Sequence, residues 1–159
     1  RMKKILIKTI LIIAYTLFLS CGYKVLDNAK TNSFNIKEIK TYGDKRINFK
    51  IKNDLMINFS ETNEQNLIIE LSTKKQKSVK EKNIKNEISK YEISLVTKVK
   101  LTIIENDVKK EFNTSTNGSY AVDKKYFDTL KNEKRLINNL TDDLSKKIAK
   151  KINQTLNDF

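Results

Sequence analysis

The residue whose surroundings point most clearly to chemistry is Cys21, the one cysteine of the sequence. It follows a basic start and an apolar run from Thr9 to Leu19, with Ser20 directly before it and Gly22 directly after it. A basic end, an apolar core and a small residue before the cleavage point are typical of a secretory signal peptide. We therefore predict a lipoprotein signal peptide at residues 1–20, after which the Cys21 thiol carries a diacylglycerol and begins the mature protein.

Two other interpretations of this segment remain open. The apolar run could be a transmembrane anchor, although it is shorter than the roughly 20 residues that a spanning helix needs. It could also be an ordinary signal peptide followed by an unrelated cysteine. Phe18 and Leu19 stand at positions −3 and −2, where a lipobox usually has leucine and a small residue. We prefer the lipid anchor because a lone cysteine at this position needs a reason.

Length and charge restrict the remaining 139 residues to one domain with one core. They hold 28 basic and 19 acidic side chains, a net charge of +9. A basic surface attracts nucleic acid, anionic lipid or acidic glycans, and export across the inner membrane would favour the lipid. Because lysine is abundant throughout the chain, part of this charge carries no function.

The residue types on which many enzymes and metal sites rely are missing. The sequence has no histidine, proline or tryptophan and three glycines. With its one cysteine assigned to the lipid, the chain lacks the usual general bases, thiol nucleophiles and transition-metal ligands. It contains no phosphate-binding glycine loop and no GxSxG pattern. We expect a protein that is not an enzyme and that uses neither cofactor nor metal.

The elements that could position a functional surface begin after a polar segment. We assign residues 21–33 to an acylated tether and residues 34–159 to a single α/β domain. A first strand is expected to end at Tyr42 and Gly43. Its apolar residues are Phe34, Ile36 and Ile39.

Asp44 is a suitable N-cap for the next element. Ile47, Ile51 and Leu55 are spaced by four, which would form one face of a helix. Ile47, Phe49 and Ile51 also alternate, as in a strand. The periodicity leaves the segment Ile47–Leu55 open between helix and strand, and we place a helix here.

The clearest pattern in the chain is the alternation of residues 91–103, which predicts a long strand with one buried face. A strand at 66–71 is expected before it. A turn at 106–107 is expected to lead into a fourth strand, 108–122, interrupted by a bulge or a strand end near 117–118. The alternating residues are Tyr91, Ile93, Leu95, Thr97, Val99, Leu101 and Ile103.

A helix of about thirty residues closes the chain, with apolar residues at spacings of three and four and one longer gap after Leu130. Its apolar stripe should cover one face of the sheet. The order of elements predicts an α+β two-layer sandwich of about four mainly antiparallel strands, with two helices on one face. The stripe consists of Phe127, Leu130, Ile137, Leu140, Leu144, Ile148, Ile152 and Leu156.

Several segments together resemble the lipopolysaccharide-assembly lipoproteins of the LptE family. They are Cys21–Tyr23 at the mature start, Ile51–Leu55 in the expected helix, Ser89–Leu95 at the start of the long strand, and Ser119–Tyr120. Lys52 stands where the family pattern leads us to expect arginine. The resemblance extends over nearly all of the mature chain in the order and length of the elements.

The resemblance implies a lipid-anchored protein of the outer membrane that faces the periplasm and plugs the lumen of an LptD-type β-barrel. It would assist assembly of this translocon and help to insert lipopolysaccharide into the outer leaflet. The implied partners are the barrel, lipopolysaccharide, and membrane lipid through acylated Cys21. Gly22 after the cysteine, rather than aspartate, is compatible with export to the outer membrane.

Two other functions stay open. One is a membrane-anchored binder or carrier of anionic lipid without a barrel partner. The other is a basic nucleic-acid-binding domain, which we disfavour because the sequence shows no aromatic and basic cluster like a base-stacking platform.

The polar stretch 72–90 is rich in lysine. We expect several of its lysines to decorate the far end of a hairpin between two strands, where they could contact the phosphates of lipopolysaccharide. The candidate contacts are Lys74, Lys75, Lys77, Lys80, Lys82 and Lys85.

Overall fold

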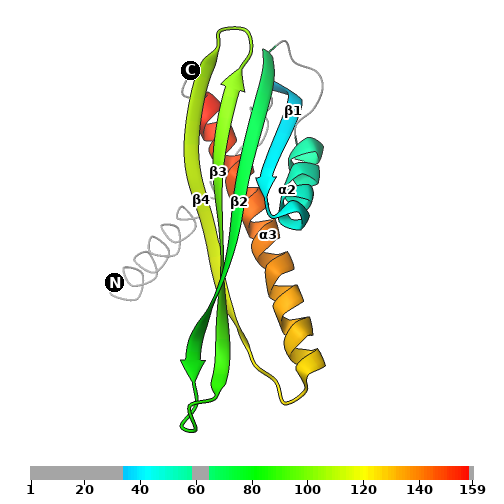
Figure 1. Cartoon of the computed structure of the whole chain (residues 1–159). Coiled ribbons are helices and arrows are strands. Elements are labelled where there is room, and N and C mark those ends of the chain that lie inside the picture. The colour runs from blue at the N-terminus through cyan, green and yellow to red at the C-terminus, as the bar shows by residue number, and fades with distance from the viewer. Residues whose placement is uncertain (1–33, 59–64, 158–159) are drawn as a thin grey trace, which may run out of the picture. The chain divides into compact units, whose positions relative to one another are not determined.

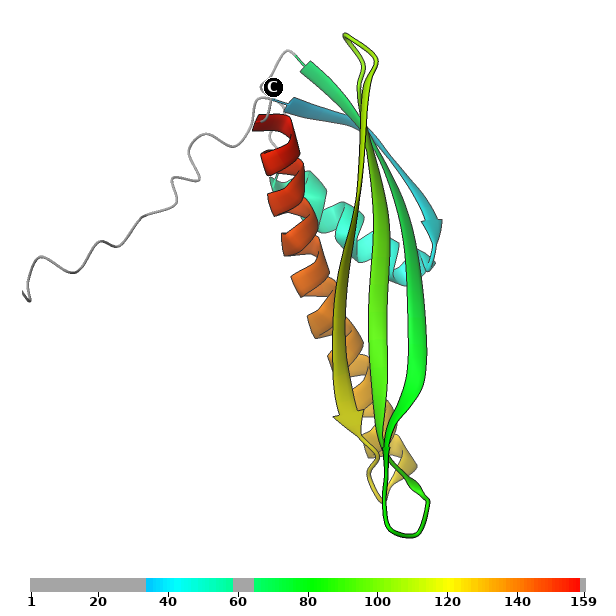
Figure 2. The same ribbon diagram turned by 90° about the vertical axis from the view of Figure 1, so that its left-hand side faces the viewer.

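The computed structural model describes residues 34–58 and 65–157 of the chain. The described elements form a four-stranded sheet in the order β1-β2-β3-β4 and two helices that cover one of its faces (Figures 1 and 2). This is an α+β fold with two layers, as the sequence predicts. The elements are β1 (Phe34–Gly43), α2 (Lys45–Asn58), β2 (Gln65–Lys82), β3 (Ile88–Ile103), β4 (Val108–Ala121) and α3 (Tyr126–Asn157).

The sheet is mixed because β1 runs parallel to β2, whereas the β2–β3 and β3–β4 pairs are antiparallel. Helix α2 provides the crossover that a parallel pair requires. β1 ends at Gly43, whose φ of 91° falls in a region that favours glycine. A Cβ at Gly43 would lie 2.1 Å from the Thr73 carbonyl oxygen. The next residue, Asp44, donates its N–H to that same oxygen over 3.1 Å.

The segment after Gly43 is a helix. The Asp44 carboxylate accepts hydrogen bonds from the N–H groups of Arg46 and Ile47, both at 3.1 Å, as an N-cap does. Ile47 and the residues four and eight positions after it are buried, whereas Phe49 is 66% exposed. The alternating strand pattern would have buried Phe49 together with Ile47, so the helical spacing of four is the correct one.

The long alternating strand is confirmed as β3, whose buried face looks toward the helices. Its buried residues are Ile93, Leu95, Thr97, Val99, Leu101 and Ile103. Tyr91 is half-buried at the start of the same face. Thr73 of β2 and Thr97 of β3 share a buried hydroxyl–hydroxyl bond of 2.8 Å, which satisfies two polar groups inside the core.

Strand β4 corrects one prediction, because it continues without a break through Asn117 and Gly118. The β3–β4 register is continuous from Val108 to Ala121, and Gly118 lies opposite Ile93. The glycine is needed for close packing: a Cβ at this position would lie 2.8 Å from Leu136 Cδ1 of α3. The Asn-Gly pair therefore marks a close approach of the helix, not a bulge or a strand end.

Helix α3 confirms the expected stripe along most of its length but not in its first turns. Phe127 is 74% exposed and Leu130 is 44% exposed. The sheet opposite these turns carries Lys77 and two tyrosines in place of aliphatic residues. The buried stripe consists of Leu140, Leu144, Ile148, Ile152 and Leu156.

Candidate functional site

The lysines predicted for a hairpin end lie mostly within strand β2. β2 extends to Lys82 and is paired with β3 along this stretch, so Lys85 alone of the six falls in the connecting turn. The placement between two strands was wrong because the polar stretch forms its hydrogen bonds to β3. The structure spreads the six along the strand and into the turn that follows it and does not gather them: Lys74, Lys75, Lys77, Lys80, Lys82 and Lys85.

Some of these lysines contact nearby carboxylates. Lys75 Nζ lies 3.9 Å from Asp44 Oδ2, and Lys80 Nζ lies 3.6 Å from Glu92 Oε1. Exposed ion pairs of this kind contribute about 0–1 kcal/mol each. A multiply charged anion can therefore compete for these ammonium groups.

Lys77 differs from its neighbours because it takes part in a cluster with two tyrosines and a glutamate. Lys77 Nζ lies 2.6 Å from Glu133 Oε2, and the Tyr120 hydroxyl donates to the same oxygen over 2.6 Å. The ammonium also lies 4.3 Å from the centroid of the Tyr91 ring, which suits a cation–π contact. The rings of Tyr91 and Tyr120 are stacked, with centroids 5.7 Å apart.

The four residues of this Lys77–Glu133 cluster come from four elements. Tyr91 and Tyr120 lie directly opposite each other in the β3–β4 register, and Lys77 lies opposite Ile93. Lys77, Tyr91 and Tyr120 were identified in the sequence for other reasons, whereas Glu133 was not predicted. The available signal was the gap in the apolar stripe after Leu130, because Glu133 occupies the inward position there.

Burial and hydrogen bonding act in opposite directions on the charged pair. Burial is the largest single effect and disfavours both charges, but the hydrogen bonds within the cluster and the attraction between opposite charges together outweigh it, raising the pKa of Lys77 and lowering the pKa of Glu133. Burial, together with the bond to Glu133, raises the pKa of Tyr120. All three groups thus keep their ordinary charge at neutral pH, and the cluster is a fixed polar connection between sheet and helix.

A groove beside this cluster separates the start of α2 from α3. It has a volume of about 330 Å³ and is lined by apolar Ile47, Leu130 and Ile137 together with charged residues of both signs, among them Asp44, Arg46, Lys75 and Glu133. A second groove of about 350 Å³ shares Arg46, Ile47 and Ile137 with it, so the two are continuous along the helices. The combination suits an apolar side chain flanked by polar groups.

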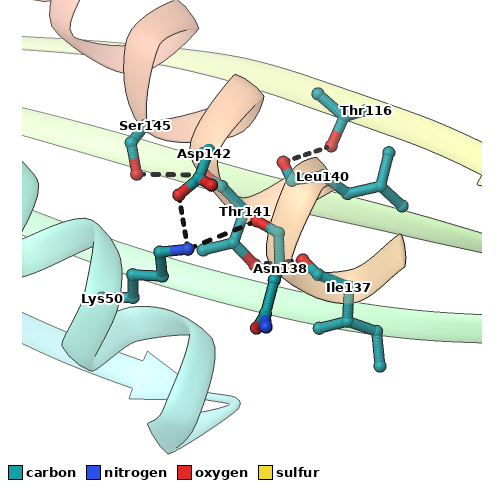
Figure 3. Close-up of polar contacts among 8 residues, drawn as sticks. All are labelled: Lys50, Thr116, Ile137, Asn138, Leu140, Thr141, Asp142 and Ser145. Atoms are coloured by element: carbon teal, nitrogen blue, oxygen red, sulfur yellow. Dashed lines mark hydrogen bonds and ion pairs between the residues drawn. The ribbon is translucent and has the colours of Figure 1, made fainter. Parts of the chain in front are cut away.

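Polar contacts join the two helices farther along this groove (Figure 3). Lys50 of α2 forms an ion pair with Asp142 of α3, and its Nζ also lies 3.4 Å from the Asn138 carbonyl oxygen. Thr116 of β4 donates to the Leu140 carbonyl oxygen over 3.2 Å. These contacts hold α3 against both α2 and the sheet.

The opposite face of the sheet has no helix over it in the described part of the chain (Figure 2). Most of its side chains are charged or polar, with Val96 as an exposed apolar exception, and Lys98 Nζ forms an ion pair of 3.0 Å with Glu111 Oε2. A shallow groove of about 460 Å³ on this face is lined mainly by polar side chains, among them Glu70 and Lys100. This face can form many hydrogen bonds with a polar surface.

Residues 34–58 and 65–157 contain neither a candidate metal cluster nor a membrane-spanning helix. No group of three or more histidine, cysteine, aspartate or glutamate side chains in these ranges could hold a metal ion. None of the helices described there is long and apolar enough to cross a membrane. Cys21, the predicted lipid anchor, lies outside the described residues, as do the predicted signal peptide and tether.

Solved structures with a similar arrangement of elements include bacterial lipoproteins. Rare lipoprotein B from Shewanella oneidensis is 12% identical, with a TM-score of 0.51 over 76% of this chain and 94% of that one. The uncharacterized lipoprotein B from Nitrosomonas europaea is 11% identical, with a TM-score of 0.61 over 86% of this chain and 93% of that one. At these identities the similarity shows the fold alone. No family model matches the chain, and no curated protein is significantly similar to it in sequence.

Proposed function

We propose that this protein is an outer-membrane lipoprotein that plugs an LptD-type β-barrel and assists assembly of the lipopolysaccharide translocon. The observation that carries the proposal is the fold, because structures with this arrangement include rare lipoprotein B and another lipoprotein B. The position of Cys21 after a predicted signal peptide agrees with the lipoprotein assignment. The family resemblance of the sequence supplies the barrel and lipopolysaccharide as partners.

The uncovered face of the sheet supports a role inside a barrel. The lumen of an outer-membrane barrel is polar, so a plug needs a surface rich in charged, hydroxyl and amide groups. The exposed positions of β3 and β4 on this face provide such groups. They include Lys98, Lys100, Glu111, Asn113, Ser115, Asn117 and Ser119.

The lysines of β2 support contact with lipopolysaccharide as the transported ligand. Residues 74–82 are all exposed and carry five lysines against one glutamate. Several ammonium groups along one strand can engage a multiply phosphorylated lipid through individually small contributions that salt screens. A spread of positive charge along a strand suits a ligand that passes over the surface better than one held in a pocket.

A carrier that shields acyl chains without a barrel receives less support. Such a carrier needs an enclosed apolar cavity, whereas the described grooves are open and bordered by charged residues such as Arg46 and Asp142. The core itself is filled by aliphatic side chains from both layers. We likewise infer a binding role, not catalysis.

Purification from membranes tests the proposal. The wild-type protein should be found in the membrane fraction after lysis. After extraction from that fraction with mild detergent, it should co-purify with a β-barrel of the outer-membrane type, identified by mass spectrometry. Two or three acyl chains, at about 0.8 kcal/mol per buried methylene, suffice for stable anchoring. Cys21→Ser is the matched control and should leave the folded domain intact but release it from the membrane or stall its precursor. Wild-type protein in the soluble fraction, without a barrel, would contradict the proposal.

A further inference from the structure

Strand β2 continues well beyond the end of its neighbour β1 (Figure 1). β1 pairs with β2 as far as Thr73, whereas the pairing of β2 with β3 extends to Lys82. Within the described residues, positions 74–82 thus have a strand on one side alone, and all of them are exposed. An exposed strand edge of this kind can accept an additional strand.

The hydrogen bond at the end of β1 shows which main-chain groups face the open side. The Thr73 carbonyl oxygen accepts the N–H of Asp44, so the main-chain groups of Thr73 point toward β1. Because this direction alternates along a strand, Lys75, Lys77 and Val79 present their N–H and C=O groups to the open side. The first irregularity in the β2–β3 register comes only after Val79. A short added strand would therefore find three regularly spaced positions.

The groove between α2 and α3 lies next to this edge, because Lys75 belongs to both. Alternate side chains of an added strand would point toward the helix layer and into the groove, where Leu130 and Ile137 offer apolar contacts. When a strand adds to a sheet edge, main-chain hydrogen bonds provide the affinity, and pockets that receive every second side chain provide the specificity. The groove favours apolar residues at those positions.

The positive charge of this edge determines which side chains suit the other positions of the added strand, those that do not enter the groove. A second copy of this chain would bring the lysines of one β2 against those of the other, and like charges opposite each other are unfavourable. An acidic strand would instead neutralise them. We propose that the edge Lys75–Val79 binds an extended segment of a partner protein, with apolar and acidic residues in alternation, as an added strand in line with β1. This edge shares lysines with the proposed lipopolysaccharide contact but does not depend on the plugging of a barrel, so the peptide test and the barrel test can fail separately.

Amide hydrogen exchange measured by NMR tests the proposal with full-length acylated protein in detergent. The probe is a synthetic peptide of alternating glutamate and valine, about six residues long, the usual length of a strand. We expect it to slow exchange of the Lys75, Lys77 and Val79 amides. Two control peptides should leave that exchange unchanged: alternating lysine and valine, and the glutamate–valine peptide with N-methyl groups on alternate residues.

A pair of variants checks the role of the main chain. Val79→Pro removes one N–H that faces the open side without removing a β2–β3 bond, and proline is tolerated on such edges. It should weaken peptide binding by about threefold to tenfold, the effect of one net hydrogen bond, whereas Val79→Ala should bind as the wild type does. Failure to bind, binding without protection of the three amides, equal binding of the N-methylated peptide, or self-association through this edge would each overturn the proposal.

Discussion

Gly118 and Glu133 are two residues whose roles could not be predicted from the sequence, and both lie where α3 meets the sheet. An Asn-Gly pair is a strong local turn signal. In this protein the role of the glycine depends on Leu136, which comes 18 positions after Gly118 and packs over it. Glu133 stands in the gap of an apolar stripe, and its partners Lys77 and Tyr120 come from distant strands. A local sequence pattern does not reveal contacts between residues that are far apart in the chain.

Replacing Gly118 by valine should destabilise the protein by about 1–3 kcal/mol, because the added atoms overpack the contact with α3. Alanine should cost less, since the nearest atom is the mobile end of the Leu136 side chain. Urea denaturation followed by circular dichroism measures the difference. Ser119→Val, on the exposed face of the same strand, is the control and should stay within about 0.5 kcal/mol of the wild type.

Glu133→Gln should lower stability by about 1 kcal/mol at neutral pH and change its dependence on acid. The folded state lowers the pKa of Glu133, so its stabilising effect is present above the ordinary value near 4.5 and is lost as pH falls below that value through the folded pKa. Wild type and variant should therefore approach each other in stability at acidic pH. Denaturation midpoints across this range provide the measurement.

Glu111→Gln is the matched control for this experiment. Glu111 forms an exposed ion pair with Lys98, so its loss should change stability by less than about 0.5 kcal/mol. It should also leave the shape of the acid profile unchanged. If the difference in stability between Glu133→Gln and the wild type were the same at every pH, the Lys77–Glu133 contact would not stabilise the ionised carboxylate.

Among the elements, the segments with a clear apolar period could be predicted, whereas the second half of β2 was missed. β3 and most of α3 repeat apolar residues with the period of their own structure, which is a direct signal of burial. The second half of β2 has no such period, because residues 74–82 are exposed and are held as a strand by pairing with β3. Residues 74–82 form a strand because they pair with β3, and their own sequence does not reveal it.

The parallel pairing of β1 with β2 was also not predicted, because alternation within a strand does not reveal the direction of its neighbour. The helix α2 between the two strands was the available signal, since a parallel pair needs a crossover of this kind. The open part of β2 follows from the same connection, because the chain leaves the sheet at Gly43 to begin α2.

The β4 edge of the sheet is occupied by lysines from α3. Lys147 and Lys151 donate to the main-chain carbonyl oxygens of Ser115 and Asn113, at 3.1 and 2.8 Å. Charged groups on an edge strand oppose pairing with other chains. Alanine at both lysines should therefore promote self-association that increases with concentration, measured by sedimentation velocity in detergent.

The control for this pair is alanine at Lys146 and Lys150, which removes the same charge from exposed positions of the same helix. It should leave the sedimentation profile as in the wild type. Equal self-association of both double variants would attribute the effect to net charge, and the absence of self-association in the variant with alanine at Lys147 and Lys151 would show that β4 does not depend on these lysines for protection.

At the scale of the whole described domain, the layer between sheet and helices changes character along α3. Near the C-terminal end of the helix it is aliphatic, with Ile103, Ile148 and Leu156 buried. Toward the N-terminal end it becomes polar and aromatic, with the Lys77–Glu133 cluster and the exposed Phe127. The aliphatic part accounts for stability, whereas the other end leaves charged and aromatic groups available to partners.

Depletion of the protein from cells should lower the amount of correctly assembled barrel and make the outer membrane permeable to large antibiotics. A plug that binds only the folded barrel stabilises it by mass action, by about 2.7 kcal/mol at a concentration of 100 times the Kd. Heat-modifiable electrophoresis of the barrel and antibiotic sensitivity measure the two effects. Complementation with the wild-type protein should restore both, whereas Cys21→Ser, which loses the lipid anchor, should restore them incompletely. Unchanged barrel levels and unchanged permeability after depletion would refute the assembly role while leaving the fold as described.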